Sequence, residues 1–180
     1  MNNQFDDLFD KTATKGHYSK EMYYKFIVSS LLSQYDKVIV TDVDVVFLGD
    51  VSIDYCAFNI SDDYYFAGVK GLRKRGTWLE NISNEYKNDF SRDEIDLLGY
   101  AGGYYIFNCK KIRRDKIEDK FIKFAIDNAY RLLQPEQDTI NICCGNRKKE
   151  LHPQALVCTY LYDMYRKKAA SRTATFLQQL

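Results

Sequence analysis

The sequence predicts a single α/β domain, and three observations support this prediction. The chain has 180 residues, which is the usual size of one domain. Hydrophobic residues make up 46% of it and it has only two prolines, so it can bury a core rather than stay disordered. Short apolar runs with strand character alternate with segments of helical periodicity, which is the pattern of an α/β architecture.

The composition excludes several classes of protein. Lys and Arg number 26 against 25 Asp and Glu, so the chain lacks the basic surplus of a nucleic-acid-binding domain. It has no apolar run of about 18 residues to span a membrane, and its acidic start is not a secretory signal. The five cysteines are scattered without a CxxC pair, so we expect no disulfide framework and no zinc site. These features favour a protein of the reducing cytoplasm.

The first third of the chain contains one predicted helix and one predicted strand. Residues 1–17 are polar, and we expect a loop there. Apolar residues recur at helical spacing over residues 19–35, which predicts an amphipathic helix. Residues 38–40 (VIV) then predict a short buried strand that is apolar on both faces, as in a parallel sheet. A second apolar run follows at residues 45–48.

The rest of the chain continues the alternation of strands and helices. In order, we expect a strand at 64–69, weak helical character over 80–98, a strand with a glycine pair at 100–107, the longest amphipathic helix at 117–133, a short helix at 136–144 and a final apolar stretch at 156–165. Pro135 should stop the longest of these helices.

Asp42 and Asp44 form the strongest local feature, because they come directly after the apolar strand. Residues two apart in an extended segment point to the same side, so the two carboxylates can converge. Carboxylate oxygens suit Mg²⁺ or Mn²⁺, and open α/β sheets bind ligands beyond the carboxyl ends of their strands. The spacing alone leaves a second interpretation open, since short acidic triplets are usually solvated loop charges.

Four segments resemble motifs of the family 8 glycosyltransferases, in the order in which that family has them. Residues 36–50 (DKVIVTDVDVVFLGD) resemble the family's Asp-x-Asp segment, and residues 23–26 (YYKF) are similar to its Tyr-x-Arg-Phe helix. Residues 100–113 resemble its Phe-Asn-x-Gly segment, and residues 136–141 (EQDTIN) its Asp-Gln-Asp-x-x-Asn segment. The resemblance covers about residues 18–160.

The resemblance implies a retaining, metal-dependent enzyme with a GT-A type fold, in which a mixed, mostly parallel sheet is flanked by helices. Such an enzyme moves a hexose from a UDP-sugar to a hydroxyl of a cell-surface glycan or lipopolysaccharide acceptor. By this resemblance, Asp42 and Asp44 hold Mn²⁺ (or Mg²⁺) against the donor diphosphate, with Val43 between them in the donor site. Asp42 would also contact the ribose. Lys25 stands where the family has an arginine near the diphosphate, and it lacks that residue's bidentate geometry.

The glycine segment allows two interpretations. Ala101 stands where the family usually has an asparagine that touches the donor sugar or the acceptor. Gly102 and Gly103 can let the backbone approach the donor closely. Alternatively, the two glycines form a bulge or turn before a core strand.

Glu136, Gln137 and Asp138 are the candidate catalytic residues. The family has Asp-Gln at the first two positions, beside the anomeric carbon, so the resemblance places Gln137 on the reacting face. Asp138 would orient sugar hydroxyls. Helix capping after Pro135 is the alternative for all three, because acidic residues are favoured in the first turn of a helix.

The sequence also departs from the family. Lys70 replaces a residue that is often acidic and binds the donor sugar, which suggests an anionic partner or an ordinary surface lysine. The His-x-x-Gly-x-x-Lys-Pro-Trp motif that supplies the third metal ligand is absent, and His152 comes too early for it, so we expect a loop residue near the acceptor cleft. The family's first strand and uracil-binding turn should precede residue 1. Basic residues 166–168 suggest a peripheral membrane contact.

Two alternatives to an active glycosyltransferase stay open. Residues 1–180 can be a complete domain or the central piece of one, so the chain can be a truncated or degenerate, non-catalytic domain. An Asp-x-Asp after an apolar strand also occurs in phosphatases of the haloacid dehalogenase type. There Asp42 would be the nucleophile and Asp44 the acid/base.

Overall fold

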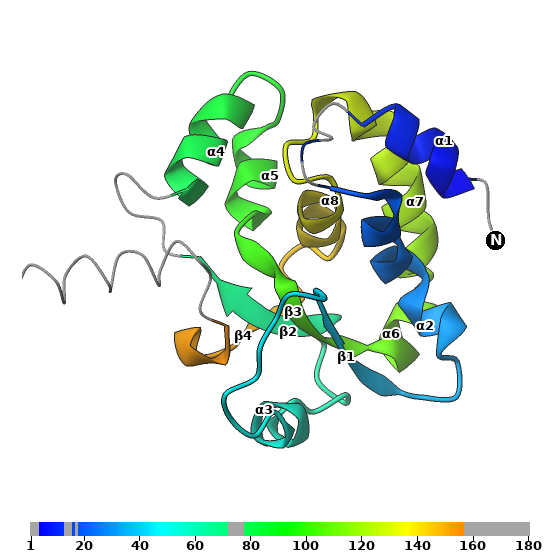
Figure 1. Cartoon of the computed structure of the whole chain (residues 1–180), viewed down its shortest axis with the longest axis vertical. Helices are drawn as coiled ribbons and strands as arrows, with labels where there is room; N and C mark the ends of the chain where they lie inside the picture. Colours follow the sequence, from blue (N-terminus) through cyan, green and yellow to red (C-terminus); the bar gives the residue numbers. More distant parts are fainter. Residues whose placement is uncertain (1–3, 13–15, 17, 72–77, 157–180) are drawn as a thin grey trace, which may run out of the picture.

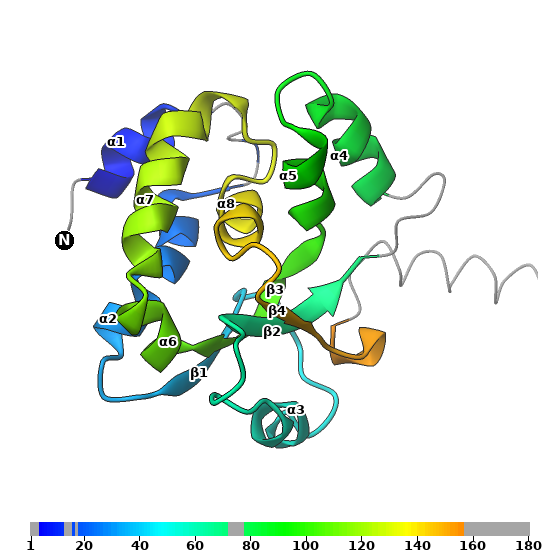
Figure 2. The same cartoon turned by 180° about the vertical axis from the view of Figure 1, so that it is seen from behind.

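The computed structural model describes residues 4–12, 16, 18–71 and 78–156. Its centre is a four-stranded sheet in the order β1-β3-β2-β4 (Figure 1). The strands are β1 (Lys37–Thr41), β2 (Phe66–Lys70), β3 (Tyr100–Asn108) and β4 (Lys148–Glu150). Most helices cover one face of this sheet, and α3 (Ser52–Ala57) lies on the other face, as the view from behind also shows (Figure 2).

The sheet is mixed, as expected, but it is not mostly parallel. Strand β3 runs antiparallel to both of its neighbours, β1 and β2, and only β2 and β4 are parallel. Two of the three pairings in the described sheet are therefore antiparallel. Parallel pairing was inferred from the apolar run at residues 38–40, and that inference was wrong.

Strand β1 is apolar on both faces because both of its faces are covered. Val38 and Val40 pack against the cluster under the helices, while Ile39 packs against the cluster on the α3 side. The strand lies at the edge of the described sheet, where Val38 is buried and its other four residues are half-buried. A run of apolar residues indicates that both faces of a strand are buried, and an antiparallel strand can be buried on both faces too.

The glycine pair lies in an irregular part of β3. Gly68 pairs with Tyr105, and Lys70 pairs with Tyr100. An advance of two residues along β2 therefore corresponds to five residues along β3. The extra residues on β3 include Gly102 and Gly103. This shift in register agrees with the interpretation of the glycines as a bulge, which lies within β3 rather than before it, at the end of the sheet that also holds the end of β1.

The helices on the larger face differ in detail from the sequence prediction. They are α1 (Gln4–Asp10), η1 (Lys20–Ile27), α2 (Val28–Leu31), α6 (Cys109–Arg114), α7 (Ile117–Asn128), η2 (Ala129–Arg131) and α8 (Pro135–Cys143). The helix expected over 19–35 is a 3₁₀ segment followed by one short α-helix. Pro135 does not stop the preceding helix, which has already ended; it begins α8, where a missing N–H costs nothing.

The prediction of a loop over residues 1–17 was wrong for α1. Phe5 and Leu8 in this short helix are each 2% exposed, and the ring of Phe5 stacks on that of Tyr23 with centroids 6.1 Å apart. Two apolar residues three positions apart give one turn a buried face, even though the segment around them is acidic. The average polarity of the segment concealed this pattern.

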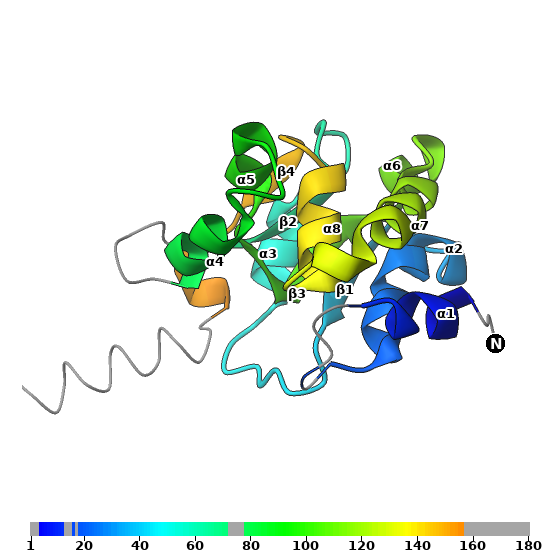
Figure 3. The same ribbon diagram turned by 90° about the horizontal axis from the view of Figure 1, so that it is seen from above.

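The remaining elements frame the sheet. They are α4 (Trp78–Tyr86), α5 (Arg92–Leu97) and η3 (Pro153–Ala155). Seen from above, α8 lies between α5 and α7 over the middle of the sheet (Figure 3). The apolar run at 45–48 is no strand: Val46 and Leu48 are 78% and 96% exposed in the loop that follows β1. The expected apolar stretch at 156–165 and the basic residues 166–168 fall almost wholly outside the described residues.

Within the part of the chain that the structure describes, no helix has both the length and the apolar character needed to cross a bilayer.

Candidate active site

The Asp-x-Asp segment begins where β1 ends. The backbone N–H of Asp42 donates to the carbonyl of Gly103 at 3.1 Å, which extends the β1–β3 ladder by one residue. The side chain of Asp42 is 44% exposed, and Val43 and Asp44 are exposed. The segment therefore holds Asp42 at the rim of the sheet, with Asp44 further out in the loop.

Lys25, from η1, connects three elements through its ammonium group. Its Nζ donates to Oδ1 of Asp42 at 2.5 Å, to Oε1 of Glu136 at 2.9 Å and to the carbonyl of Gly102 at 2.9 Å. The Lys25 side chain is only 10% exposed, and that of Glu136 is 9% exposed. The structure thus brings the end of β1, the glycine segment of β3 and the first turn of α8 to one point.

The first turn of α8 supplies the polar groups above the glycines. Oε1 of Gln137 accepts a hydrogen bond from the backbone N–H of Gly102 at 2.7 Å, and its Nε2 donates to the side chain of Gln134. Asp138 is 1% exposed, and its Oδ2 accepts from the hydroxyl of Tyr86 at 2.5 Å and from the N–H of Gln134 at 3.0 Å. Asp138 therefore stabilises the entry to α8, which agrees with the capping interpretation.

Gly102 lies so close to α8 that an added Cβ would be in tight contact with the side chains there. A Cβ at this position would lie 3.1 Å from both carboxylate oxygens of Glu136 and 3.3 Å from Oε1 of Gln137. At Gly103 the nearest atom to a Cβ would be Oδ2 of Asp42, at an ordinary 3.5 Å. Ala101 beside them is 7% exposed. The close approach of Glu136 and Gln137 thus explains the glycine at position 102.

Burial and charge shift the acid–base properties of this cluster. Burial raises the pKa of Glu136, and the ammonium of Lys25 opposes that rise. Burial raises the pKa of Asp138 to about 7. Burial alone would lower the pKa of Lys25, but the charge of Glu136 and the contact with Asp42 outweigh it, and the pKa is raised. The ammonium is therefore firmly protonated at neutral pH.

Sequence analysis missed several residues that border the site. Burial raises the pKa of Tyr18, and the charges of Glu136, Asp138 and Asp42 raise it further, so this tyrosine lies near the cluster. The side chain of Leu156 would lie 3.6 Å from a Cβ at Gly103. Neither residue carries a local signal, because an isolated tyrosine or leucine is usually a core residue.

A fully buried tyrosine lies beneath the cluster. The ring centroid of Tyr105 is 6.0 Å from Nζ of Lys25, and its buried hydroxyl has no hydrogen-bond partner among the described residues. Tyr105 belongs to a strand rich in aromatic residues, so the sequence did not indicate that its ring lies beside Lys25.

Lys70 and His152 lie at the carboxyl ends of β2 and β4. Nζ of Lys70 is 5.7 Å from the ring centroid of Tyr100. His152 is exposed and caps η3, where its Nδ1 accepts from the N–H of Gln154 at 3.3 Å. No three Asp, Glu, His or Cys residues are grouped to hold a metal ion in the described part of the chain. A third ligand for Asp42 and Asp44 is thus not found there.

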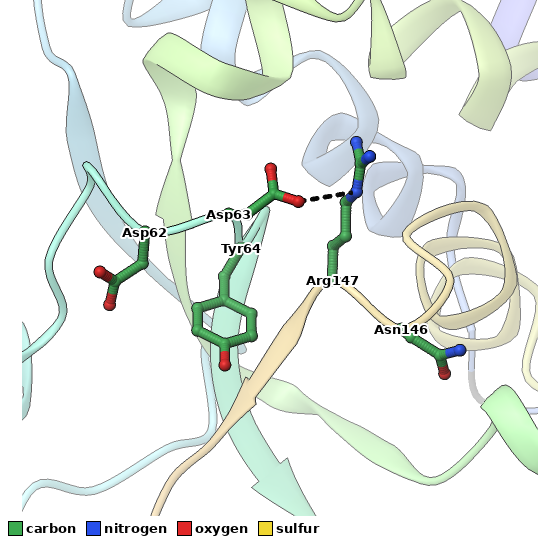
Figure 4. A pocket seen from close by; sticks show the side chains of 5 residues that line it. All are labelled: Asp62, Asp63, Tyr64, Asn146 and Arg147. Atoms are coloured by element: carbon green, nitrogen blue, oxygen red, sulfur yellow. Dashed lines mark ion pairs between the residues drawn. The ribbon is translucent and has the colours of Figure 1, made fainter.

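A hollow lies at the opposite end of the sheet from this cluster (Figure 4). Asp62, Asp63, Tyr64, Asn146 and Arg147 line it, just before β2 and β4 begin. Nε of Arg147 pairs with Oδ2 of Asp63 at 3.2 Å, and Lys111 pairs with the same aspartate at 2.5 Å. Arg147 and Lys111 thus neutralise the charge of Asp63 within the protein.

Comparison with known proteins agrees with this arrangement. Residues 2–177 match the profile described as Glycosyl transferase family 8. A search among curated proteins gives no significant match. The family match does not support a phosphatase of the haloacid dehalogenase type.

Three solved structures share the fold. The glycosyltransferase GlyE of Streptococcus pneumoniae TIGR4 is 17% identical, with a TM-score of 0.56 over 88% of this chain and 33% of that one. The bifunctional glycosyltransferase WbbM is 19% identical, with a TM-score of 0.56 over 78% and 26%. The galactosyltransferase LgtC, solved with donor and acceptor sugar analogues, is 16% identical, with a TM-score of 0.63 over 82% and 50%.

These likenesses confirm the expected α/β fold of GT-A type, with a mixed sheet flanked by helices. The chain spans half or less of the length of each of these structures.

Proposed function

Because the chain belongs to glycosyltransferase family 8, we propose that its site transfers a hexose from a UDP-sugar to a hydroxyl of a glycan or lipid-linked glycan. One observation carries this proposal. Asp42, Lys25 and Glu136 come from three separate elements and meet beside the backbone of Gly102 at one end of the sheet. That end is where sheets of this class bind ligands.

The charge of the site supports a metal ion as part of donor binding. The structure places the ammonium of Lys25 between the carboxylates of Asp42 and Glu136, and Asp44 adds a third carboxylate two residues further along the loop. A diphosphate would add negative charge to a site that is already acidic, so a cation is needed to bind it. Carboxylate oxygens fit Mn²⁺ or Mg²⁺, and Oδ2 of Asp42 and the carboxylate of Asp44 would hold the ion. It would neutralise charge on the leaving diphosphate.

Gln137 is the residue best placed to contact the donor sugar. Its amide already makes one hydrogen bond through each end, to Gly102 and Gln134, and these bonds fix its orientation. One acceptor lone pair and one N–H remain for a ligand. Gly103, whose neighbours leave room for an ordinary contact, lets the donor approach the backbone.

The family resemblance implies that transfer would retain the anomeric configuration, and the buried Glu136 favours a route without a covalent intermediate. Glu136 is the carboxylate nearest the glycines, but it is buried and bound to Lys25, which withdraws it from nucleophilic attack. Front-face transfer, in which the leaving diphosphate helps to deprotonate the acceptor hydroxyl, fits these residues better than a double displacement.

A second candidate is a domain that binds the donor without turnover. Ala101 cannot make the amide contacts that the family's asparagine makes, and the described residues supply two carboxylate ligands rather than three. Both features would lower the rate of transfer more than the affinity for the donor.

Release of UDP from a panel of UDP-sugars, measured with and without Mn²⁺, tests the proposal. Asp44→Asn should lower Mn²⁺-dependent release by about 100-fold or more, because it removes a metal ligand. Asp127→Asn, at an exposed carboxylate that pairs with Lys123 on α7, is the matched control and should leave the rate unchanged. Mn²⁺-dependent UDP binding without release would favour the non-catalytic candidate, and a wild-type chain that neither binds nor releases UDP would reject both.

A further inference from the structure

The ammonium of Lys25 has the surroundings of a bound cation. Three oxygen atoms from three elements lie 2.5, 2.9 and 2.9 Å from Nζ: Oδ1 of Asp42, Oε1 of Glu136 and the carbonyl oxygen of Gly102. Two of the three oxygens carry negative charge. Oxygen donors of this kind are also what a hard metal ion selects.

Lys25 has no donor to spare for a ligand. An ammonium group has three N–H donors, and each is used within the protein. To reach a diphosphate, Lys25 would have to release one of these oxygens. Release of Glu136 would leave a buried carboxylate without its counter-charge, which is strongly unfavourable.

We propose that Lys25 is a positioning residue that acts as a tethered cation. It holds the end of β1 and the first turn of α8 together without any metal ion, and it binds Oδ1 of Asp42, while Oδ2 lies beside Gly103. One part of this inference rests on the proposed function: that the donor's metal would bind Asp42 through Oδ2. Without the lysine, the same three oxygens form an open cation site.

The unfolding temperature of Lys25→Met, measured in EDTA and in Mn²⁺, tests this proposal. The methionine keeps the apolar stem and removes the charge. In EDTA we expect the unfolding temperature to fall by about 5–10 °C, because a buried carboxylate loses its partner. In Mn²⁺ we expect at least half of that loss to be restored, since the ion replaces the ammonium. A merely structural lysine would show the loss without the recovery.

Lys148→Met is the matched control. This lysine is also buried, at 8% exposure, but among the described residues its Nζ donates to two carbonyls, those of Leu97 and Asn141, at 2.6 and 2.7 Å. Its loss should destabilise the chain without recovery in Mn²⁺, because no carboxylate is left unpaired. Equal recovery of both variants would overturn the proposal, as would an absence of recovery in Lys25→Met.

A double variant keeps the test decisive if Lys25→Met does not fold. Lys25→Met with Glu136→Gln removes the buried charge together with its partner, so it should unfold at a higher temperature than Lys25→Met alone. A double variant that is no more stable than the single one would reject the tethered cation. None of these measurements needs a nucleotide. Failure of wild-type UDP binding would therefore reject the proposed function and leave this inference standing.

Discussion

At the scale of single residues, Gly102 is the position where the site leaves least room. Its backbone N–H binds Gln137, its carbonyl binds Lys25, and the carboxylate of Glu136 occupies the space that a side chain would need. The backbone of one residue therefore fixes three side chains of the proposed site.

Gly102→Ala should disrupt this arrangement. The added Cβ meets oxygen atoms at 3.1 Å, so Glu136 and Lys25 must shift, and we expect a loss of about 1–3 kcal/mol in the free energy of unfolding. Urea denaturation measures this loss. Gly49→Ala is the control, because no atom lies within 4 Å of a Cβ there. Equal stability of the two variants would show that α8 does not pack against Gly102 as described.

Asp138 should make the stability of the chain depend on pH. Its pKa is about 7 in the folded chain, raised by burial from 3.8. Below about pH 4 the carboxyl is protonated in both states. As the pH rises from about 4 to about 7, the unfolded chain loses a proton that the folded chain keeps, so the free energy of unfolding falls.

Asp138→Asn should remove that fall, which is on the order of 4 kcal/mol. Denaturation of both proteins across this pH range measures it, and the advantage of the wild type over the variant should shrink as the pH rises. A constant difference between the two would contradict the raised pKa.

At the scale of elements, the entry to α8 depends on contacts from distant parts of the chain. The hydroxyl of Tyr86, at the end of α4, donates to Asp138 and accepts from the N–H of Leu133. Asn141 binds both the N–H and the carbonyl of Tyr100, so it connects α8 to the start of β3. These contacts hold the first turn of α8 over the glycines.

Tyr86→Phe should therefore cost about 1–3 kcal/mol of stability, because it leaves the buried Asp138 and the Leu133 N–H each short of a partner. Tyr104→Phe is a matched control, since that buried hydroxyl has no hydrogen-bond partner among the described residues. Its removal should be neutral or stabilising. Thermal denaturation compares the two, and an equal loss in both would contradict the account of α8.

The sequence predicted well the elements that have a long, regular pattern of apolar residues. It predicted poorly how the strands pair. The strand 100–107, the helix that begins at Ile117 and the helix after Pro135 were all found close to their observed bounds. The antiparallel pairing of β1 could not be predicted, because an apolar run shows that a strand is covered but not which way its neighbour runs.

At the scale of the whole molecule, the motifs predicted which segments meet but not how they touch. The segments around Lys25, Asp42, Gly102 and Glu136 do come together. The saturated ammonium of Lys25 could not be foreseen, because it depends on three elements far apart in the sequence. Tyr18 and Leu156 border the site for the same reason: the fold places them there, and no local pattern does.

Calorimetric titration of UDP into the wild-type chain, with Mn²⁺ and in EDTA, tests most directly whether this cluster is a metal-dependent donor site. The site is acidic, and the ammonium of Lys25 is already bound to Asp42 and Glu136. We therefore expect UDP to bind in Mn²⁺ and not in EDTA. Asp42→Asn should abolish the Mn²⁺-dependent heat. Binding of equal strength in EDTA, or no binding in Mn²⁺, would contradict the proposed function.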